Sequence, residues 1–282
     1  MIKLSEPITA QEWKSDVKPV WCPGCGDYGV LNATIRALVE LQLDPSHVAI
    51  MSGIGCSGRF PAYLNAYGFH GVHGRALPLA TGVKMANPDL TVLAVSGDGD
   101  AFSIGAGHLP HAARRNVDIT YLVLDNSIYG MTKGQPSPTS PCGTRRKASP
   151  YGSIDTPANP IAMMLAYGTS FVARGLAFKV KDLTNLIKQA IEHPGFAFVH
   201  VLSACVTFND TYSLLKEITA PIPEDYDPTD RLEAMRLAWE TQLYTGVFYR
   251  DRQSTYSERI AGLSEVAGHD FALEEVIERF RR

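Results

Sequence analysis

The sequence contains no hydrophobic run that is long enough to cross a bilayer. Its longest apolar stretches, such as residues 91–96 and 196–206, are much shorter than the ~20 residues that a membrane-spanning helix needs. The N-terminal stretch MIKLSEPITAQEWKS lacks the apolar core of a secretory signal peptide. These two absences predict a cytoplasmic protein that has no contact with membranes.

Neither sign of charge dominates the chain. Its 26 Lys and Arg residues nearly balance 29 Asp and Glu residues, which leaves a net charge of −3. No basic excess points to a nucleic-acid partner, and no block of like charges indicates a disordered tail. With 45% hydrophobic residues over 282 positions, the chain can bury a large core.

Cysteine is scarce, and its odd number argues against a disulfide scaffold. The five cysteines are Cys22, Cys25, Cys56, Cys142 and Cys205. The first two form a Cys-x-x-Cys motif in WCPGCG, where proline and glycine predict a loop and not the helix start of a thioredoxin-like dithiol. We therefore expect this pair to bind metal.

Predicted strands and helices alternate along the first 220 residues, which form the expected main domain. We expect strands within residues 47–55, 90–100, 118–126 and 195–204, and helices at residues 28–43, 76–88, 105–116, 161–168 and 180–193, the third of them disturbed by Pro110. This alternation predicts an α/β fold with a doubly wound, mostly parallel sheet. Ligands of such sheets bind beyond the carboxyl ends of the strands.

Two further segments stand apart from this alternation. Residues 129–152 are dense in Pro, Gly, Ser and Thr and predict a long loop, which is usually functional inside a compact domain. Residues 221–282 are richer in charge and tyrosine and show no obvious strand. We expect them to form a mostly helical C-terminal extension.

The strongest chemical signal is SGDGDAF, residues 96–102, directly after a predicted strand. Phe102 breaks both the dinucleotide fingerprint G-x-G-x-x-G and the EF-hand pattern, and no Walker lysine follows. What remains is Asp98 between two glycines. A carboxylate repels a phosphate unless a divalent cation lies between them, and Mg²⁺ commonly bridges the two.

A second oxygen ligand is expected at the end of the next strand. Asn126 lies there, 28 residues after Asp98, which is the spacing of a strand–helix–strand unit. A plain tight turn and a helix cap would explain either residue alone, but the pair at this spacing favours a cation site.

Cys56 and Cys205 each follow a predicted strand, so both belong at the same edge of the sheet as the Cys22–Cys25 loop. Four thiolates suit a zinc ion or an iron–sulfur cluster, and the spacing does not separate the two. The isolated cysteines at 56 and 205 are also compatible with plain buried residues.

The Gly-Asp-Gly…Asn pair resembles the thiamine diphosphate motif. Together with WCPGCG, GIGCSGR, HGRALPLATGVK, HAARRN and DNSIYGMTKGQPSPT, it resembles the β subunits of 2-oxoacid:ferredoxin oxidoreductases over about residues 15–215. The resemblance implies a thiamine diphosphate-binding fold. It also implies Mg²⁺ bound by the side chains of Asp98 and Asn126 and the Ile128 carbonyl.

The resemblance implies further site residues. A 4Fe–4S cluster would be held by Cys22, Cys25, Cys56 and Cys205, with Cys142 a free thiol. His73 would act near the cofactor, and the Arg59 guanidinium would clamp a substrate carboxylate. The cofactor would contact Ile54, Gly55, Cys56, Ser57, His73, Gly97, Asp98, Gly99, Asp100, Asn126, Ile128, Tyr129, Gly130, Met131 and Thr132.

The implied activity is reversible, coenzyme A-dependent oxidative decarboxylation of a 2-oxoacid, with electrons passed through the cluster to ferredoxin. We expect 2-oxoglutarate as substrate, with pyruvate next. Because the chain holds one diphosphate motif, the pyrimidine-binding domain would come from an α subunit in an (αβ)₂ assembly. The alternative is a non-catalytic zinc- and nucleotide-binding α/β module.

Overall fold

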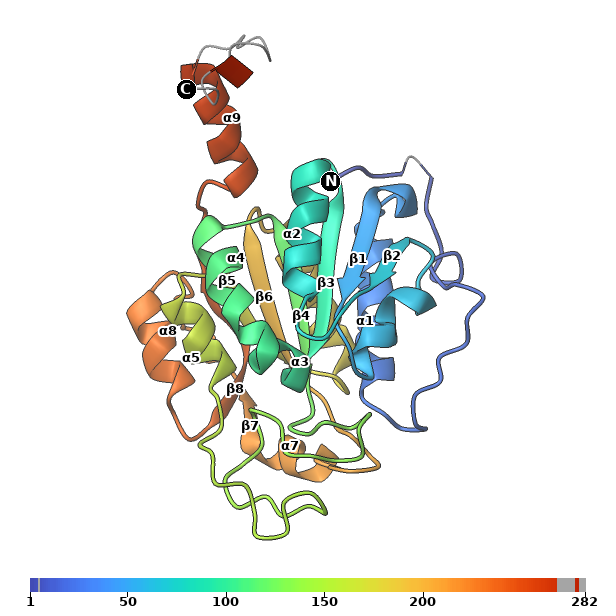
Figure 1. Cartoon of the computed structure of the whole chain (residues 1–282), viewed down its shortest axis with the longest axis vertical. Coiled ribbons are helices and arrows are strands. Elements are labelled where there is room, and N and C mark those ends of the chain that lie inside the picture. The colour runs from blue at the N-terminus through green and yellow to red at the C-terminus, as the bar shows by residue number, and fades with distance from the viewer. Residues whose placement is uncertain (5, 268–276, 279–282) are drawn as a thin grey trace.

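A single twisted sheet forms the centre of the computed structural model, which describes residues 1–4, 6–267 and 277–278. Within these residues the sheet has eight strands in the order β2-β1-β3-β4-β6-β5-β8-β7 (Figure 1). The strands are β1 (Val48–Ser52), β2 (Tyr67–His70), β3 (Thr91–Gly97), β4 (Ile119–Asp125), β5 (Phe171–Leu176), β6 (Phe196–Leu202), β7 (Thr219–Pro221) and β8 (Leu243–Arg250). All neighbours run parallel except β5 and β8, which pair antiparallel.

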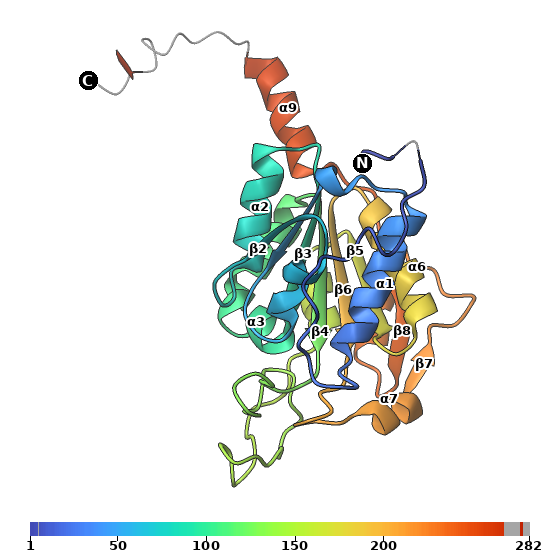
Figure 2. The ribbon, with the colours of Figure 1, turned by 90° about the vertical axis from the view of Figure 1, so that its right-hand side faces the viewer.

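Helices cover both faces of the sheet, as the alternation of elements predicts (Figure 2). α1 and α6 pack on one face, and α2, α4, α5 and α8 pack on the other. The helices are α1 (Asp27–Glu40), α2 (Ala76–Ala86), α3 (Asp98–Phe102), α4 (Leu109–Arg115), α5 (Pro160–Ala166), α6 (Val180–Glu192), α7 (Tyr212–Ile218), α8 (Arg231–Ala238) and α9 (Tyr256–Ala267). Short 3₁₀ helices are η1 (Pro45–His47), η2 (Ser57–Tyr63) and η3 (Ile104–His108).

Burial explains why these residues form these elements. All seven residues of β4 are buried, as expected for a central parallel strand covered on both faces. α6 buries Leu183, Leu186, Ile187 and Ala190, which share one helical stripe. The central strands therefore hold their carboxyl ends in fixed positions, and the site is built at those ends.

Pro110 divides the predicted helix at residues 105–116. The chain forms η3 up to His108, and α4 then begins at Leu109 with Pro110 in its first turn. Proline is tolerated there because a first-turn N–H has no partner within the helix. α4 ends at Asn116, whose φ of 51° is a left-handed cap.

Four strands are absent from the prediction, namely β2, β5, β7 and β8. β2 is fully exposed, and Arg174 interrupts the apolar pattern of β5. The expectation of no strand in the extension is wrong, because β8 pairs along the edge of β5. The sequence did not indicate this strand because only Phe248 and Tyr249 of its eight residues are buried. Residues 268–276 and 279–282 of the expected extension lie outside the described residues, and the division at residue 220 stays a prediction.

Across the described part of the chain, the structure has no helix that combines the length and apolar character of a membrane span.

Candidate active site

A pocket of about 480 Å³ opens at the carboxyl ends of β1, β3 and β4. Its size suits a small-molecule site, and its place is where a doubly wound sheet binds ligands. Every residue predicted to contact the cofactor lines this pocket. Gln135, which belongs to the motif DNSIYGMTKGQPSPT, also lines it, as do Asp27 and Leu124, which the sequence analysis did not identify. The structure thus gathers the predicted set, while its role in binding stays a prediction.

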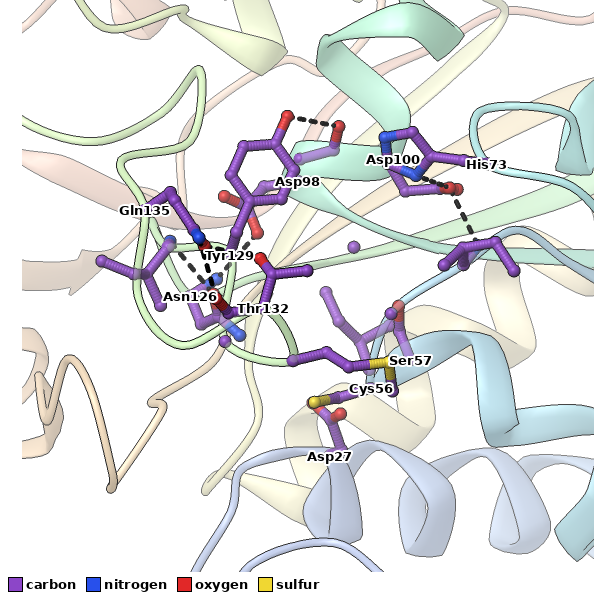
Figure 3. A pocket seen from close by; sticks show the side chains of 18 residues that line it. Asp27, Cys56, Ser57, His73, Asp98, Asp100, Asn126, Tyr129, Thr132 and Gln135 are labelled. Atoms are coloured by element: carbon purple, nitrogen blue, oxygen red, sulfur yellow. Dashed lines mark hydrogen bonds and ion pairs between the residues drawn. The ribbon is translucent and has the colours of Figure 1, made fainter. Parts of the chain in front are cut away.

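Asp98 and Asn126 meet across the ends of β3 and β4. The Asn126 backbone N–H donates to Asp98 Oδ1 at 3.4 Å, and the Ile128 N–H donates to Asn126 Oδ1 at 3.1 Å. Figure 3 shows Asp98, Asn126 and Tyr129 grouped on one side of the pocket. A carboxylate and an amide oxygen in this arrangement are hard oxygen donors of the kind that Mg²⁺ prefers.

The long loop after β4 supplies a residue that the sequence analysis missed. Thr139 Oγ1 lies 3.0 Å from Asp98 Oδ2 and 2.7 Å from Asp125 Oδ1, so one buried hydroxyl joins two carboxylates. The sequence analysis named residues 129–132 at the start of this loop but not Thr139, because the fold of the loop further along depends on contacts with distant strands. The only local sequence feature that points to Thr139 is the density of Ser and Thr in SPTS, residues 137–140.

The pKa values of the two buried carboxylates, Asp98 and Asp125, are shifted in opposite directions. Burial raises the pKa of Asp98 well above its ordinary value, and the Asp125 charge adds to the effect. Asp125 is also buried, but hydrogen bonds from His200 and Thr139 hold its pKa below the ordinary range. A divalent cation at Asp98 would offset the cost of its buried charge.

Asp100 organises the backbone around the pocket. Its Oδ1 accepts from the backbone N–H groups of Ile54 at 2.9 Å and Gly74 at 2.7 Å, and its Oδ2 accepts from Ser96 Oγ at 2.6 Å. His73 Nδ1 lies 2.9 Å from the same Oδ1. The Asp100 side chain therefore ties together the loops after β1, β2 and β3 and fixes His73 beside the pocket.

The Cys22–Cys25 turn packs against the segment that leads to Cys205. The Gly26 N–H donates to the Ala204 carbonyl at 3.2 Å, and the Tyr212 hydroxyl donates to the Gly24 carbonyl at 3.0 Å. A Cβ at Gly26 would lie 2.1 Å from Ser203 Oγ, so only glycine permits this approach. The turn predicted to bind metal is thus held next to the end of β6.

Cys56 and Cys205 complete this edge. Burial raises the pKa of the Cys56 thiol to about 11, and the charges of Asp27, Cys205 and Cys22 act in the same direction. The pKa of Cys25 is raised mainly by burial, with Asp27, Cys56 and Cys205 adding to it. Cys56 therefore lies within electrostatic range of the other three cysteines, and a cationic cluster would offset the cost of ionising them.

No three His, Cys, Asp or Glu side chains in the described ranges converge closely enough to hold one metal ion. Cys142 is exposed in the long loop, where its Sγ lies 3.5 Å from the Ser153 carbonyl oxygen.

Comparison with known proteins decides the family. A family model described as the thiamine pyrophosphate enzyme C-terminal TPP binding domain matches residues 48–201, and one described as the C-terminal part of the pyruvate ferredoxin oxidoreductase beta subunit matches residues 205–265. The 2-oxoacid:ferredoxin oxidoreductase subunit beta of Saccharolobus solfataricus is 44% identical over 259 residues, which cover 86% of this chain and 85% of that one. The chain belongs to the 2-oxoacid:ferredoxin oxidoreductase β-subunit family.

Two further relatives of this family have names that refer to 2-oxoglutarate. The 2-oxoglutarate synthase subunit KorB of Methanothermobacter thermautotrophicus is 43% identical over 208 residues, which cover 74% of this chain and 73% of that one. The solved 2-oxoglutarate:ferredoxin oxidoreductase of Magnetococcus marinus, with 2-oxoglutarate, coenzyme A and succinyl-CoA bound, superposes with a TM-score of 0.94 at 44% identity. That match covers 98% of this chain and 97% of that one.

The β-subunit family assignment confirms the resemblance and the fold class expected from the sequence. It leaves the non-catalytic zinc- and nucleotide-binding alternative without support. Arg59 is exposed on η2 and does not line the pocket, so its role in substrate binding stays a prediction, as does the role of His73.

Proposed function

We propose that this chain is the β subunit of an enzyme that oxidatively decarboxylates 2-oxoglutarate with coenzyme A and passes the electrons to ferredoxin. The choice of 2-oxoglutarate over pyruvate is supported by the names of the relatives and by the ligands of the Magnetococcus marinus structure. The proposed cofactors are thiamine diphosphate, Mg²⁺ and a 4Fe–4S cluster.

One observation carries the proposal: Cys56 belongs both to the pocket wall and to the group of four cysteines. It lines the pocket with Asp98 and Asn126, and its thiol lies within electrostatic range of Cys22 and Cys205. Figure 3 shows Cys56 beside Asp27, across the pocket from Asp98. A cluster held by these cysteines would adjoin the cofactor pocket, which suits the transfer of single electrons out of the site.

The residues present fit the proposed groups. Asp98, Asn126 and the Ile128 carbonyl would hold Mg²⁺, and the loop at residues 129–135 would lie along the diphosphate. Thiamine diphosphate, when bound, supplies the electron sink that decarboxylation of a 2-oxoacid requires. In this proposal Asp98 would position that group and Asp100 would hold His73 at the rim of the pocket. The four cysteines would hold the cluster beside the pocket, which Cys56 also lines.

The proposal includes partners. The names of the relatives as β subunits support an α subunit, which would supply the pyrimidine-binding half of the site in an (αβ)₂ assembly. We expect the separate chain to bind cofactor weakly and to turn over no 2-oxoacid. We propose that Arg59 binds the second carboxylate of 2-oxoglutarate. Its charge lies within electrostatic range of Cys56 at the pocket.

Anaerobic co-purification with the α subunit tests the proposal. A brown complex that reduces ferredoxin with 2-oxoglutarate and coenzyme A is the expected result, and Arg59→Met should weaken the preference for 2-oxoglutarate over pyruvate. A colourless complex that contains zinc, or a brown one that is inactive with every 2-oxoacid, would contradict it.

A further inference from the structure

A row of buried polar side chains crosses the sheet and ends at the candidate cation site. Arg174 lies on β5, His200 on β6 and Asp125 at the end of β4, and these three strands are neighbours. Thr139, in the loop after β4, continues the row to Asp98. We call Arg174, His200, Asp125 and Thr139 the polar chain.

The hydrogen bonds of the polar chain have a fixed direction. Arg174 Nε lies 3.2 Å from His200 Nδ1, and because a guanidinium only donates, this ring nitrogen must accept. The proton of the neutral ring is then on Nε2, which donates to Asp125 Oδ2 at 2.8 Å. The positive charge of Arg174 thus faces the negative charge of Asp125 across a neutral imidazole.

Asp125 connects the hydrogen bonds of Arg174 and His200 to the predicted metal ligands. Its Oδ1 accepts from Thr139 Oγ1 at 2.7 Å, and the same hydroxyl lies 3.0 Å from Asp98 Oδ2. It also accepts from the Ser127 N–H at 2.9 Å, which fixes the turn between Asn126 and Ile128. The Asp125 carboxylate therefore fixes the turn that carries Asn126 and Ile128, and it holds the Thr139 hydroxyl next to Asp98.

The far end of the polar chain is equally constrained. Arg174 Nη1 donates to the Tyr244 carbonyl at 3.3 Å, and its Cζ lies 5.2 Å from the centre of the Phe248 ring. The His200 ring stacks on Phe198 with an interplanar angle of 12°. The residues that line the pocket include Asp98 and Asn126 but neither Arg174 nor His200.

We infer that Arg174 and His200 are positioning residues for the divalent cation that anchors the cofactor diphosphate. The inference rests on the proposed function, because it concerns the same site. Partners behind the ligands of a metal site commonly set its affinity, since they fix the orientation of each ligand. Here the partners lie on β6 and β5, one and two strands beyond β4, and reach the ligands through Asp125.

Mn²⁺ binding to the complex of the full chain and its α subunit tests this inference. With saturating thiamine diphosphate, free Mn²⁺ is followed by electron paramagnetic resonance. We expect His200→Phe and Arg174→Met to raise the dissociation constant for Mn²⁺ by roughly tenfold. The matched variant His200→Gln keeps one donor and one acceptor and should bind Mn²⁺ as the wild type does.

Folding is monitored by circular dichroism and by the visible absorption of the cluster. Where His200→Phe does not fold, Arg174→Met decides, together with Thr139→Val against Thr139→Ser at the other end of the polar chain. Folded variants that bind Mn²⁺ like the wild type, or a His200→Gln variant as weak as His200→Phe, overturn the inference. Wild-type complex that binds no Mn²⁺ with thiamine diphosphate overturns the proposed cofactor site and the inference with it.

Discussion

The Tyr129 hydroxyl donates to the carbonyl oxygen of Gly99 at 3.1 Å, and its ring fills the space that a side chain at Gly99 would need. A Cβ at Gly99 would lie 2.2 Å from the ring. Gly99 is next to Asp98, and Tyr129 opens the turn that closes on Gln135. The second glycine of GDGD, Gly99, therefore allows Tyr129 to pack directly against the turn that carries Asp98.

Gly99→Ala should open this contact. The added methyl group must displace Tyr129 or α3, and overpacking of this kind costs about 1–3 kcal/mol. We expect a lower thermal midpoint and loss of thiamine diphosphate binding, measured by calorimetry on the complex. Gly82→Ala is the control, because Gly82 faces open space in α2. Unchanged cofactor binding by Gly99→Ala would show that the close approach is dispensable.

Asp98→Asn should separate cofactor binding from folding. Burial raises the pKa of Asp98, so its ionised form is costly where no cation is bound. The amide oxygen can still accept from the Asn126 N–H, and the amide NH₂ group can donate to Thr139 Oγ1. We expect an unchanged or higher thermal midpoint without metal, whereas Mg²⁺ and thiamine diphosphate together should no longer raise it. Asp89→Asn, at the opposite end of β3, should keep the full ligand-induced shift.

Cys22→Ser and Cys142→Ser form a matched pair of exposed cysteines. Cys22 belongs to the four-cysteine group, whereas Cys142 lies in the long loop. We expect Cys22→Ser to lose the brown colour and ferredoxin reduction while still binding thiamine diphosphate. Cys142→Ser should keep all three properties. Equal iron content in the two variants would refute the proposed set of ligands.

His193 should make stability depend on pH. Burial lowers its pKa in the folded protein to about 4, and its Nε2 lies 2.8 Å from Ser170 Oγ. Between the ordinary pKa of ~6.5 and this value, the unfolded chain takes up a proton that the folded protein does not, so stability falls as the pH falls. Above about pH 6.5 His193 is neutral in both states and does not contribute to the pH dependence of stability.

Thermal midpoints of the full chain between pH 7 and pH 4.5 would measure this contribution, and His193→Gln should flatten the decline. His111→Gln, on the exposed side of α4, should leave the decline unchanged. A wild-type slope in His193→Gln would mean that other groups, such as buried carboxylates, account for the whole acid sensitivity.

Strand ends explain how much of the site could be predicted. Asp98 and Asn126 directly follow the buried strands β3 and β4, and Cys56 follows β1 by four residues. Parallel strands bring such positions to one edge. The spacing of apolar residues in α1 and α6 likewise predicts which face of each helix is buried. Local pattern and parallel geometry therefore suffice for these residues.

Roles that depend on distant partners could not be predicted. Arg174 is a charge inside β5, and its burial is explained only by His200, 26 positions away, and Tyr244, 70 positions away. Thr139 lies in a loop without regular structure, and its contact with Asp98 spans 41 positions. Asp100 lies two positions after Asp98, yet its carboxylate accepts from the backbone N–H groups of Ile54 and Gly74, 46 and 26 positions away.

β8 lies against β5 as an antiparallel neighbour and thereby joins residues 243–250 of the C-terminal extension to the sheet. A protein shortened before Leu243 would present the apolar β5 with a bare row of N–H and C=O groups. Such an edge recruits strands from other molecules. Shortened versions of this subunit should therefore self-associate, and interface mapping should use the chain at full length.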